Sequence, residues 1–415
     1  MQVPPVLSVA LAVSLGLGSC ASPVRLNHRP VGFWAAAERG RLPTAATASP
    51  AHQEPRPPQE PAPAQGDPAP ARGRGERTAR APAPHLSLDL FGGYGLSLGN
   101  SRDWTGLRIN FRDRGAGHLR GVNLTLWAPA DHAVERIDGL ALGVAPVADH
   151  LRGVALGALA SVTEDASEGI GLAGLAVVSS GNLSGIHAAG LAAVAERDMD
   201  GLQLAGLAVV SEGNVSGLSA GGVAMVAEGD ATGVQLGGLA TVTEGAMSGV
   251  NLAGLAAVAE GSISGITASG LAAVAEDELD GVAGAGLAAI GSQHVTGVAI
   301  AGLHVGDGGE ELFDLNLTGA LENPSTSACG ILVAGFGVQA GTIEGLSIAG
   351  IFNRAEDFTG VGLSACNAVS GTQTGLTVGI FNHAEDLRGV QIGLLNHVPS
   401  NPWWARWLPL VNVRT

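Results

Sequence analysis

The sequence predicts an all-β protein whose body is a β-solenoid with coils of about sixteen residues. The first observation behind this prediction is a glycine that recurs every sixteen residues. The second is the unit itself, G-V-x-L-A-G-L-A-x-V-x-E-G-x-φ-S with φ apolar, in which the second, fourth, eighth and tenth positions are apolar, as in short strands. The third is composition, because 64 glycines and 4% aromatic residues disfavour helices and a wide core. The anchor glycines are Gly153, Gly169, Gly185, Gly201, Gly217, Gly233, Gly249, Gly265, Gly281 and Gly297.

An outer-membrane β-barrel is the alternative fold. A barrel alternates strand direction, so its natural period is a hairpin of two units, and it carries aromatic girdles at both membrane interfaces. Here consecutive units are equivalent, and residues 153–312 contain no aromatic residue. Equivalent units favour a solenoid, in which every coil runs in the same direction and like positions stack on like.

Stacking explains why the unit is repeated. One coil buries about five small apolar side chains, worth on the order of 10 kcal/mol. Ordering its residues costs roughly 20 kcal/mol. A single coil is therefore unstable, and hydrogen bonds and burial between neighbouring coils must supply the difference.

The first segment, residues 1–20, has the outline of an export signal that ends in "LGSC". This ending resembles the lipobox of bacterial lipoproteins, which implies lipidation of Cys20 and a membrane anchor through it. A plain secretory signal with a chance cysteine is the alternative. Residues 21–84 are rich in Pro, Ala and Arg and lack apolar periodicity, so we expect a disordered tether.

The solenoid is expected to have three parts and a cap. Regular repeats occupy 153–312, between degenerate N-terminal coils at 86–152 and degenerate C-terminal coils at 313–398. Gly297 and Gly345 are 48 residues apart, which corresponds to three units. The tail at 399–415 holds three tryptophans and is expected to cap the open end of the stack.

In the C-terminal coils the motif becomes "GLSIAGIFN" at 345–353, "GLTVGIFN" at 375–382 and "GVQIGLLN" at 389–396. This pattern resembles the bacterial surface repeat-containing proteins first named from Leptospira, which carry tandem G-L-Q-I-G-L-x-N units behind an export signal. The resemblance implies an exported protein of the outer membrane or cell surface and supplies no activity. A periplasmic or secreted location is the alternative.

Two sets of polar residues are candidate site residues. The asparagines of the C-terminal coils are expected to stack as a structural ladder at one turn, where their amides would bond to the backbone and to each other. The ladder consists of Asn353, Asn367, Asn382 and Asn396. The glutamates at the twelfth position are expected to form a solvated acidic edge, because stacked carboxylates repel unless they share cations. This edge consists of Glu196, Glu212, Glu228, Glu244, Glu260 and Glu276.

No catalytic, cofactor or metal site is expected. His383 and His397 lie one coil apart, but a metal site needs a third ligand that the sequence does not offer. The one irregular stretch, 304–330, contains "HVGDGGEE". A carbohydrate-active solenoid enzyme working at that stretch is the alternative function.

The partner expectations follow from charge and pattern. A net charge of −16 disfavours nucleic acid as a partner. The ninth and eleventh positions are expected to face outward as an Ala-rich face that binds a protein partner or another copy, with Ala193, Ala257 and Ala273 among its members. The sequence thus predicts a non-enzymatic, lipid-anchored envelope scaffold.

Overall fold

The computed structural model describes residues 85–89, 94–127, 134–306 and 326–414, all of which belong to one compact unit. These residues form strands and turns and no helix, so no described helix could span a membrane. The expectations for Cys20 and for residues 21–84 lie outside the described residues.

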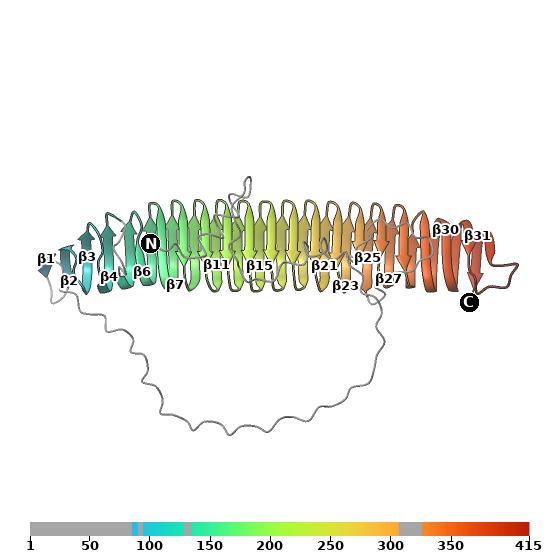
Figure 1. Ribbon diagram of the computed structural model, residues 1–415, viewed down its shortest axis with the longest axis horizontal. Helices are drawn as coiled ribbons and strands as arrows, with labels where there is room; N and C mark the ends of the chain where they lie inside the picture. The colour runs from blue at the N-terminus through green and yellow to red at the C-terminus, as the bar shows by residue number, and fades with distance from the viewer. Residues whose placement is uncertain (1–84, 90–93, 128–133, 307–325, 415) are drawn as a thin grey trace, which may run out of the picture. The chain divides into compact units, whose positions relative to one another are not determined.

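The described strands stack into a parallel β-solenoid, as the repeat predicts (Figure 1). In the regular part each coil contributes one longer and one shorter strand, and each strand pairs in parallel with its equivalent in the next coil. The pairing of Gly201 with Gly217, and of Gly217 with Gly233, shows that the ladder keeps the register of the sequence repeat. Only the first and last pairs of described strands, β1–β2 and β30–β31, are antiparallel.

The N-terminal strands are β1 (His85–Asp89), β2 (Tyr94–Gly99), β3 (Trp104–Asn110), β4 (Ala116–Thr125), β5 (Val134–Gly143), β6 (Val147–Gly157) and β7 (Ala160–Ala173). The longer strands of the regular coils are β9 (Asn182–Ala189), β11 (Met199–Ala205), β13 (Val215–Gly221), β15 (Ala231–Gly237), β17 (Met247–Ala253), β19 (Ile263–Ser269), β21 (Glu278–Ala285) and β23 (His294–Ala301). The shorter strands are β8 (Ala176–Ser179), β10 (Ala192–Ala195), β12 (Ala208–Ser211), β14 (Ala224–Ala227), β16 (Ala240–Thr243), β18 (Ala256–Ala259), β20 (Ala272–Ala275), β22 (Ala288–Gly291) and β24 (His304–Gly306). The C-terminal strands are β25 (Ser327–Ala334), β26 (Gly337–Gln339), β27 (Thr342–Ala349), β28 (Phe352–Ala355), β29 (Asp357–Leu363), β30 (Cys366–His397) and β31 (Trp407–Arg414).

The anchor glycines have a backbone reason. Gly233 has a φ of +107°, and a Cβ there would lie 2.2 Å from the carbonyl oxygen of Gly217 one coil earlier. The other anchors of the regular coils share both the positive φ and the close approach. Only glycine can adopt the positive φ and also tolerate so close an approach of the neighbouring carbonyl oxygen. Glycine therefore recurs every sixteen residues.

One spacing differs from the sequence expectation. Gly297 pairs directly with Gly330, and Gly330 pairs with Gly345, so two steps of the ladder replace the three units expected between Gly297 and Gly345. The coil between Gly297 and Gly330 includes 307–325, which lie outside the described residues. The register resumes after this long coil because β25 pairs with β23 along its whole length.

The core is thin and consists of small side chains from both strands of each coil. Counting from the anchor glycine, the third, fifth, ninth, eleventh and fifteenth positions face inward. In the coil that begins at Gly201 these are Gln203, Ala205, Val209, Ser211 and Val215, each buried. The fifteenth position carries the larger residues of the column, among them Met199, Met247 and Ile263.

The expected Ala-rich outer face is wrong. Ala193, Ala257 and Ala273 are 0% exposed and lie in the core. The error has a simple origin, because a period of two looks the same when it is shifted by one residue, and the shift exchanges the two faces. Larger apolar side chains usually face the core, but here the two closely packed strand layers admit only small residues at the ninth and eleventh positions.

Candidate functional site

The larger side chains excluded from the core form a continuous apolar edge on the surface. The seventh position lies in the turn that joins each longer strand to the following shorter strand, and it is leucine in all but one regular coil. We call this column the leucine edge; it consists of Leu159, Leu175, Leu191, Leu207, Val223, Leu239, Leu255, Leu271, Leu287 and Leu303. Leu191, Leu239 and Leu271 are 44%, 48% and 43% exposed.

Backbone hydrogen bonds between coils hold the leucine edge in place. The amide of Leu207 donates to the carbonyl oxygen of Leu191 at 2.8 Å, and the amide of Leu255 donates to that of Leu239 at 2.7 Å. Each turn is thus tied to its neighbour through the residue that carries the exposed side chain. The leucines form a straight ridge with the spacing of the strand ladder, ~4.8 Å per coil.

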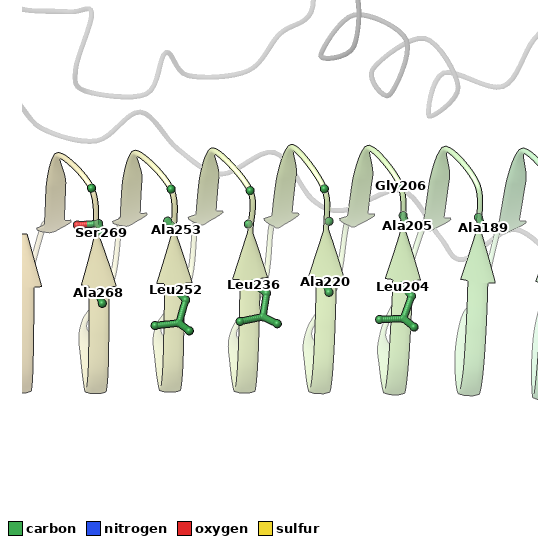
Figure 2. Close-up of a pocket in the computed structure, with 16 residues that line it drawn as sticks. Ala189, Leu204, Ala205, Gly206, Ala220, Leu236, Leu252, Ala253, Ala268 and Ser269 are labelled. Carbon is green, nitrogen blue, oxygen red and sulfur yellow. The ribbon is translucent and has the colours of Figure 1, made fainter.

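A shallow apolar groove runs beside this ridge along the ends of the longer strands (Figure 2). Its volume is about 850 Å³, and its lining comes from the fourth, fifth and sixth positions of successive coils. Leu204, Leu236 and Leu252 project from the strands, Ala220 leaves a gap between Leu204 and Leu236, and Ala268 follows Leu252 at the end of the row. No charged residue lines the groove.

The groove stays open because its floor is made of glycine. A Cβ at Gly206 would lie 2.0 Å from the carbonyl oxygen of Gly190, and a Cβ at Gly254 would lie 1.9 Å from that of Gly238. Coil stacking therefore excludes side chains from this column. A second hollow of about 570 Å³ shares Ala189 with the groove and continues it toward the N-terminal coils.

The expected acidic edge occupies the opposite turn of each coil, beyond the end of the shorter strand. Glu212, Glu228, Glu244 and Glu276 are exposed, and Glu196 and Glu260 are half-buried. Partial burial raises the pKa of Glu260, and the carboxylates of Glu244 and Glu276 raise it further. The described part of the chain contains no group of three or more His, Cys, Asp or Glu residues placed to hold a metal ion.

Other acidic residues of this turn accept hydrogen bonds from backbone amides of the next coil. The carboxylate of Asp198 accepts a hydrogen bond at 2.9 Å from the amide of Asn214, one coil later. The side-chain oxygen of Asn214 accepts from the amide of Asp230 in the same way, and Asp230 accepts from the amide of Ala246. Part of the negative charge at this edge is therefore explained by stacking.

The four asparagines of the expected ladder form one hydrogen-bonded column. The amide nitrogens of Asn353, Asn367 and Asn382 donate to the side-chain oxygens of Asn367, Asn382 and Asn396 at 2.9, 2.8 and 2.8 Å. All four side chains are buried. The column lies on strands β28 and β30 and faces the core, which corrects the expected position at a turn. Its last member also donates to the carbonyl oxygen of Leu408 in β31.

The histidine pair lies at the C-terminal end of the stack. The Nδ1 atoms of His383 and His397 are 2.9 Å apart, so one ring donates to the other. The ring of His397 stacks on Trp407 with centroids 3.9 Å apart. Burial lowers the pKa of His383, and the neighbouring His397 lowers it further. These contacts join β31 to the last coil.

The acidic residues of the irregular stretch and the two cysteines of the C-terminal coils form no further candidate site among the described residues. The acidic residues of 307–325 lie outside the described residues, and Cys329 and Cys366 are free thiols. The leucine edge and its groove were missed by the sequence reasoning. The sequence does carry a signal for the leucine edge, because a Gly-Leu pair recurs at the sixth and seventh positions of nearly every regular coil. This pair lies in a turn and belongs to neither strand layer.

We compared the chain with family models, with curated protein sequences and with solved structures, and none of the three comparisons gives a match.

Proposed function

We propose that this chain is an exported, lipid-anchored scaffold of the bacterial envelope whose solenoid binds other macromolecules through its leucine edge. The observation that carries this proposal is the exposure of the edge over the regular coils, where every member is exposed except Leu207 and Val223, which are half-buried. Contiguous apolar surface of this length is uncommon on a monomeric soluble protein and is typical of an interaction surface.

The charge distribution supports the same proposal. Between residues 153 and 312 the sequence has eighteen acidic residues and one basic residue, Arg197. The glutamate column lies at the turn opposite the leucine edge, so a partner on the leucine edge has no charge to desolvate. The solenoid thus has one edge that favours water and one that favours an apolar partner.

The anchoring part of the proposal rests on the N-terminal sequence. The apolar run that ends in Cys20, followed by the Pro-rich segment 21–84, is the arrangement of a lipoprotein with a spacer. The "GLxIGLxN"-like motifs of the C-terminal coils and their resemblance to Leptospira-type surface repeat proteins support an envelope location. The scaffold is proposed to act without catalysis.

Metabolic labelling tests the anchor. The full chain is expressed in a bacterium with labelled palmitate, beside the variant Cys20→Ser. We expect the native chain to take up label and to sediment with the envelope, and the variant to lose the label. A native chain that stays unlabelled and unprocessed in the cytoplasm would contradict the proposal, whereas a processed but unlabelled chain would indicate a plain secretory signal.

A further inference from the structure

We propose that the turn between β30 and β31 is a membrane-binding element, which inserts two tryptophans into the headgroup region of an anionic lipid bilayer. We call this turn the tryptophan tip; it consists of Pro402, Trp403, Trp404 and Arg406. It lies at the C-terminal end of the stack (Figure 1). This inference goes beyond the proposed anchor at Cys20 and the proposed role of the leucine edge, and it depends on neither.

Contacts within the solenoid account for only one of the three tryptophans in the tail. The ring of Trp407 stacks on His397 with centroids 3.9 Å apart. Trp403 and Trp404 instead project into solvent, where they are 83% and 66% exposed. Because their large apolar rings leave water only when a partner covers them, two adjacent exposed tryptophans indicate a binding surface.

The backbone of the tryptophan tip is ordered by hydrogen bonds without any partner. The amide of Ala405 donates to the carbonyl oxygen of Pro402 at 2.7 Å, and the amide of Val398 donates to that of Arg406 at 2.9 Å. Asn401 and Ala405, which flank the exposed residues, are both buried. The turn is therefore held at both ends, so binding through it requires little further ordering of the chain.

The composition around the tip favours a bilayer over a polysaccharide. Between residues 402 and 411 nine residues are apolar and one is polar, Arg406, and Leu410 in β31 is 67% exposed. The nearby amides of Asn401 and Asn412 are buried against each other, with a hydrogen bond of 3.3 Å. A sugar site needs exposed polar groups that bond hydroxyls, whereas a membrane interface suits apolar residues with tryptophan.

The charge of the tail favours an anionic headgroup. Residues 399–415 contain Arg406, Arg414 and no acidic residue, in a chain whose net charge is −16. Arg414 pairs with Asp386 at 2.8 Å. Arg406 is exposed, and its Nε donates to the carbonyl oxygen of Asn401 at 3.3 Å, which fixes the guanidinium beside the turn. A guanidinium in this place can bind a lipid phosphate at the depth of the indole rings.

The open edge of β31 disfavours a second copy of the chain as the partner. A strand added from another copy would have to pair along Trp407–Arg414. Pro409 has no amide to donate, and Leu410 has a φ of +71°, so the edge is interrupted in its middle. Interruptions of this kind protect edge strands against strand addition.

Fluorescence quenching by brominated lipid tests whether the tip enters a bilayer. The full chain, with Cys20→Ser to remove the anchor and Trp34→Phe to simplify the emission, is mixed with vesicles of phosphatidylcholine and phosphatidylglycerol. Their acyl chains carry bromine close to the headgroup. We expect the double variant Trp403→Ala, Trp404→Ala to lose most of the quenching. The control Trp127→Ala removes a tryptophan that is 55% exposed in the N-terminal coils, and it should retain the quenching.

Urea denaturation separates membrane binding from a structural role. The double variant Trp403→Ala, Trp404→Ala should unfold at the urea concentration of the native chain, because both side chains are exposed. Trp407→Ala should unfold at a lower concentration, because it loses the stack on His397. A double variant as unstable as Trp407→Ala would assign the two tryptophans to the fold and contradict the proposal.

The variant Arg406→Gln tests the preference for anionic lipid. In the native chain, quenching should be stronger with phosphatidylglycerol present than with phosphatidylcholine alone. Arg406→Gln should abolish this difference and leave the quenching by phosphatidylcholine vesicles unchanged, because the tryptophans remain. A difference that persists in Arg406→Gln would overturn the role assigned to this guanidinium.

Three results would overturn the proposal as a whole. The first is a native chain whose quenching equals that of the double tryptophan variant. The second is a dimer in sedimentation velocity that requires Trp403 and Trp404 while no vesicle quenches them, which would assign the tip to a second copy. The third is cosedimentation with an insoluble polysaccharide that requires both residues, again without quenching. Each leaves the labelling test of Cys20 unaffected, so the two proposals fail separately.

Discussion

The regular coils and the C-terminal coils share one backbone ladder but hold their cores together in different ways. In the regular coils the ninth position is a small residue such as Ala257 or Ala273, and packing fills the core. In the C-terminal coils the same position is asparagine, and each amide bonds to the next at 2.8–2.9 Å. One region relies on close packing, and the other on a continuous chain of hydrogen bonds.

The third position shows the same contrast. In the regular coils Gln235 is buried, and neither of its polar side-chain atoms has a hydrogen-bond partner among the described residues. In the last coils Gln391 donates to the side-chain oxygen of Gln373 at 2.8 Å, while only its own side-chain oxygen has no partner among the described residues. Buried polar groups stabilise a fold only when they are paired. Polar residues in the core should therefore cost stability in the middle of the solenoid and supply it at the end.

The largest effect should come from the glycine ladder, which both regions share. In Gly249→Ala the new Cβ would lie 2.2 Å from the carbonyl oxygen of Gly233, at a φ of +106°. We expect a loss of about 4 kcal/mol in the free energy of unfolding, from chemical denaturation, because the backbone must move to relieve the contact.

The control is Gly284→Ala, where a Cβ has no atom within 4 Å and φ is not positive. It should change stability by less than about 1 kcal/mol. Equal effects of the two changes would contradict the role assigned to the anchor glycines.

The second prediction concerns the asparagine column. Asn382→Ala removes bonds to Asn367, to Asn396 and to the carbonyl oxygen of Ile392. We expect a loss of about 3 kcal/mol, because the neighbouring amides are left buried and unpaired. Hydrogen exchange should show that the loss is local to the C-terminal coils, since each coil contacts only its neighbours.

The matched change in the regular coils is Asn251→Ala. Asn251 makes one long bond of 3.4 Å to Thr267, and its side-chain oxygen has no partner in the described part of the chain. Its removal should cost less than about 1 kcal/mol. If both variants lost the same stability, the two regions would not differ as proposed.

The third prediction uses a titratable residue in the core of the regular coils. His187 is buried, and burial lowers its pKa to about 4, although the neighbouring side chain of Gln203 opposes the shift. The folded state therefore resists protonation that the unfolded chain accepts near pH 6.5. Stability should fall as the pH drops from 7 to 5, by about 2 kcal/mol from this residue alone.

The measurement is the difference between the native chain and His187→Gln in urea denaturation at both pH values. Carboxylates titrate equally in both proteins, so the difference isolates the histidine. A pH dependence that is unchanged in His187→Gln would show that the imidazole titrates normally in the folded state.

Much of this architecture could be predicted from the sequence, because a glycine at a fixed interval marks each step of the parallel strand ladder. Anchors such as Gly201 and Gly217 are invariant, since their positive φ and close approach exclude every other residue. The parallel register followed directly from the equal spacing of these anchors. Sequence also identified the asparagine column, because the residue recurs at one position of four successive coils.

The two faces could not be predicted in the same way. A strand of alternating apolar and small residues has two possible orientations, and the larger residues usually face the core. Here the thin core reverses this preference, so that Ala193 is buried while Leu204 is 37% exposed. The leucine edge was missed for the same reason, since a turn residue belongs to neither face of a strand pattern. The distance between the strand layers decides these placements, and it is a property of the assembled stack.

The smallest predicted effect is also the one that separates the two regions most directly, because its sign should differ between them. Gln235→Leu replaces a buried amide without described partners by an apolar side chain of similar size. We expect it to leave stability unchanged or to raise it by up to about 1 kcal/mol. Gln391→Leu, at the same position of the last coil, removes the bond to Gln373 and should lower stability by about 1 kcal/mol. Chemical denaturation of both variants gives the comparison. A loss of stability in Gln235→Leu would mean that ordered water satisfies this amide inside the regular coils, and the regular core would then be bonded as fully as the C-terminal one.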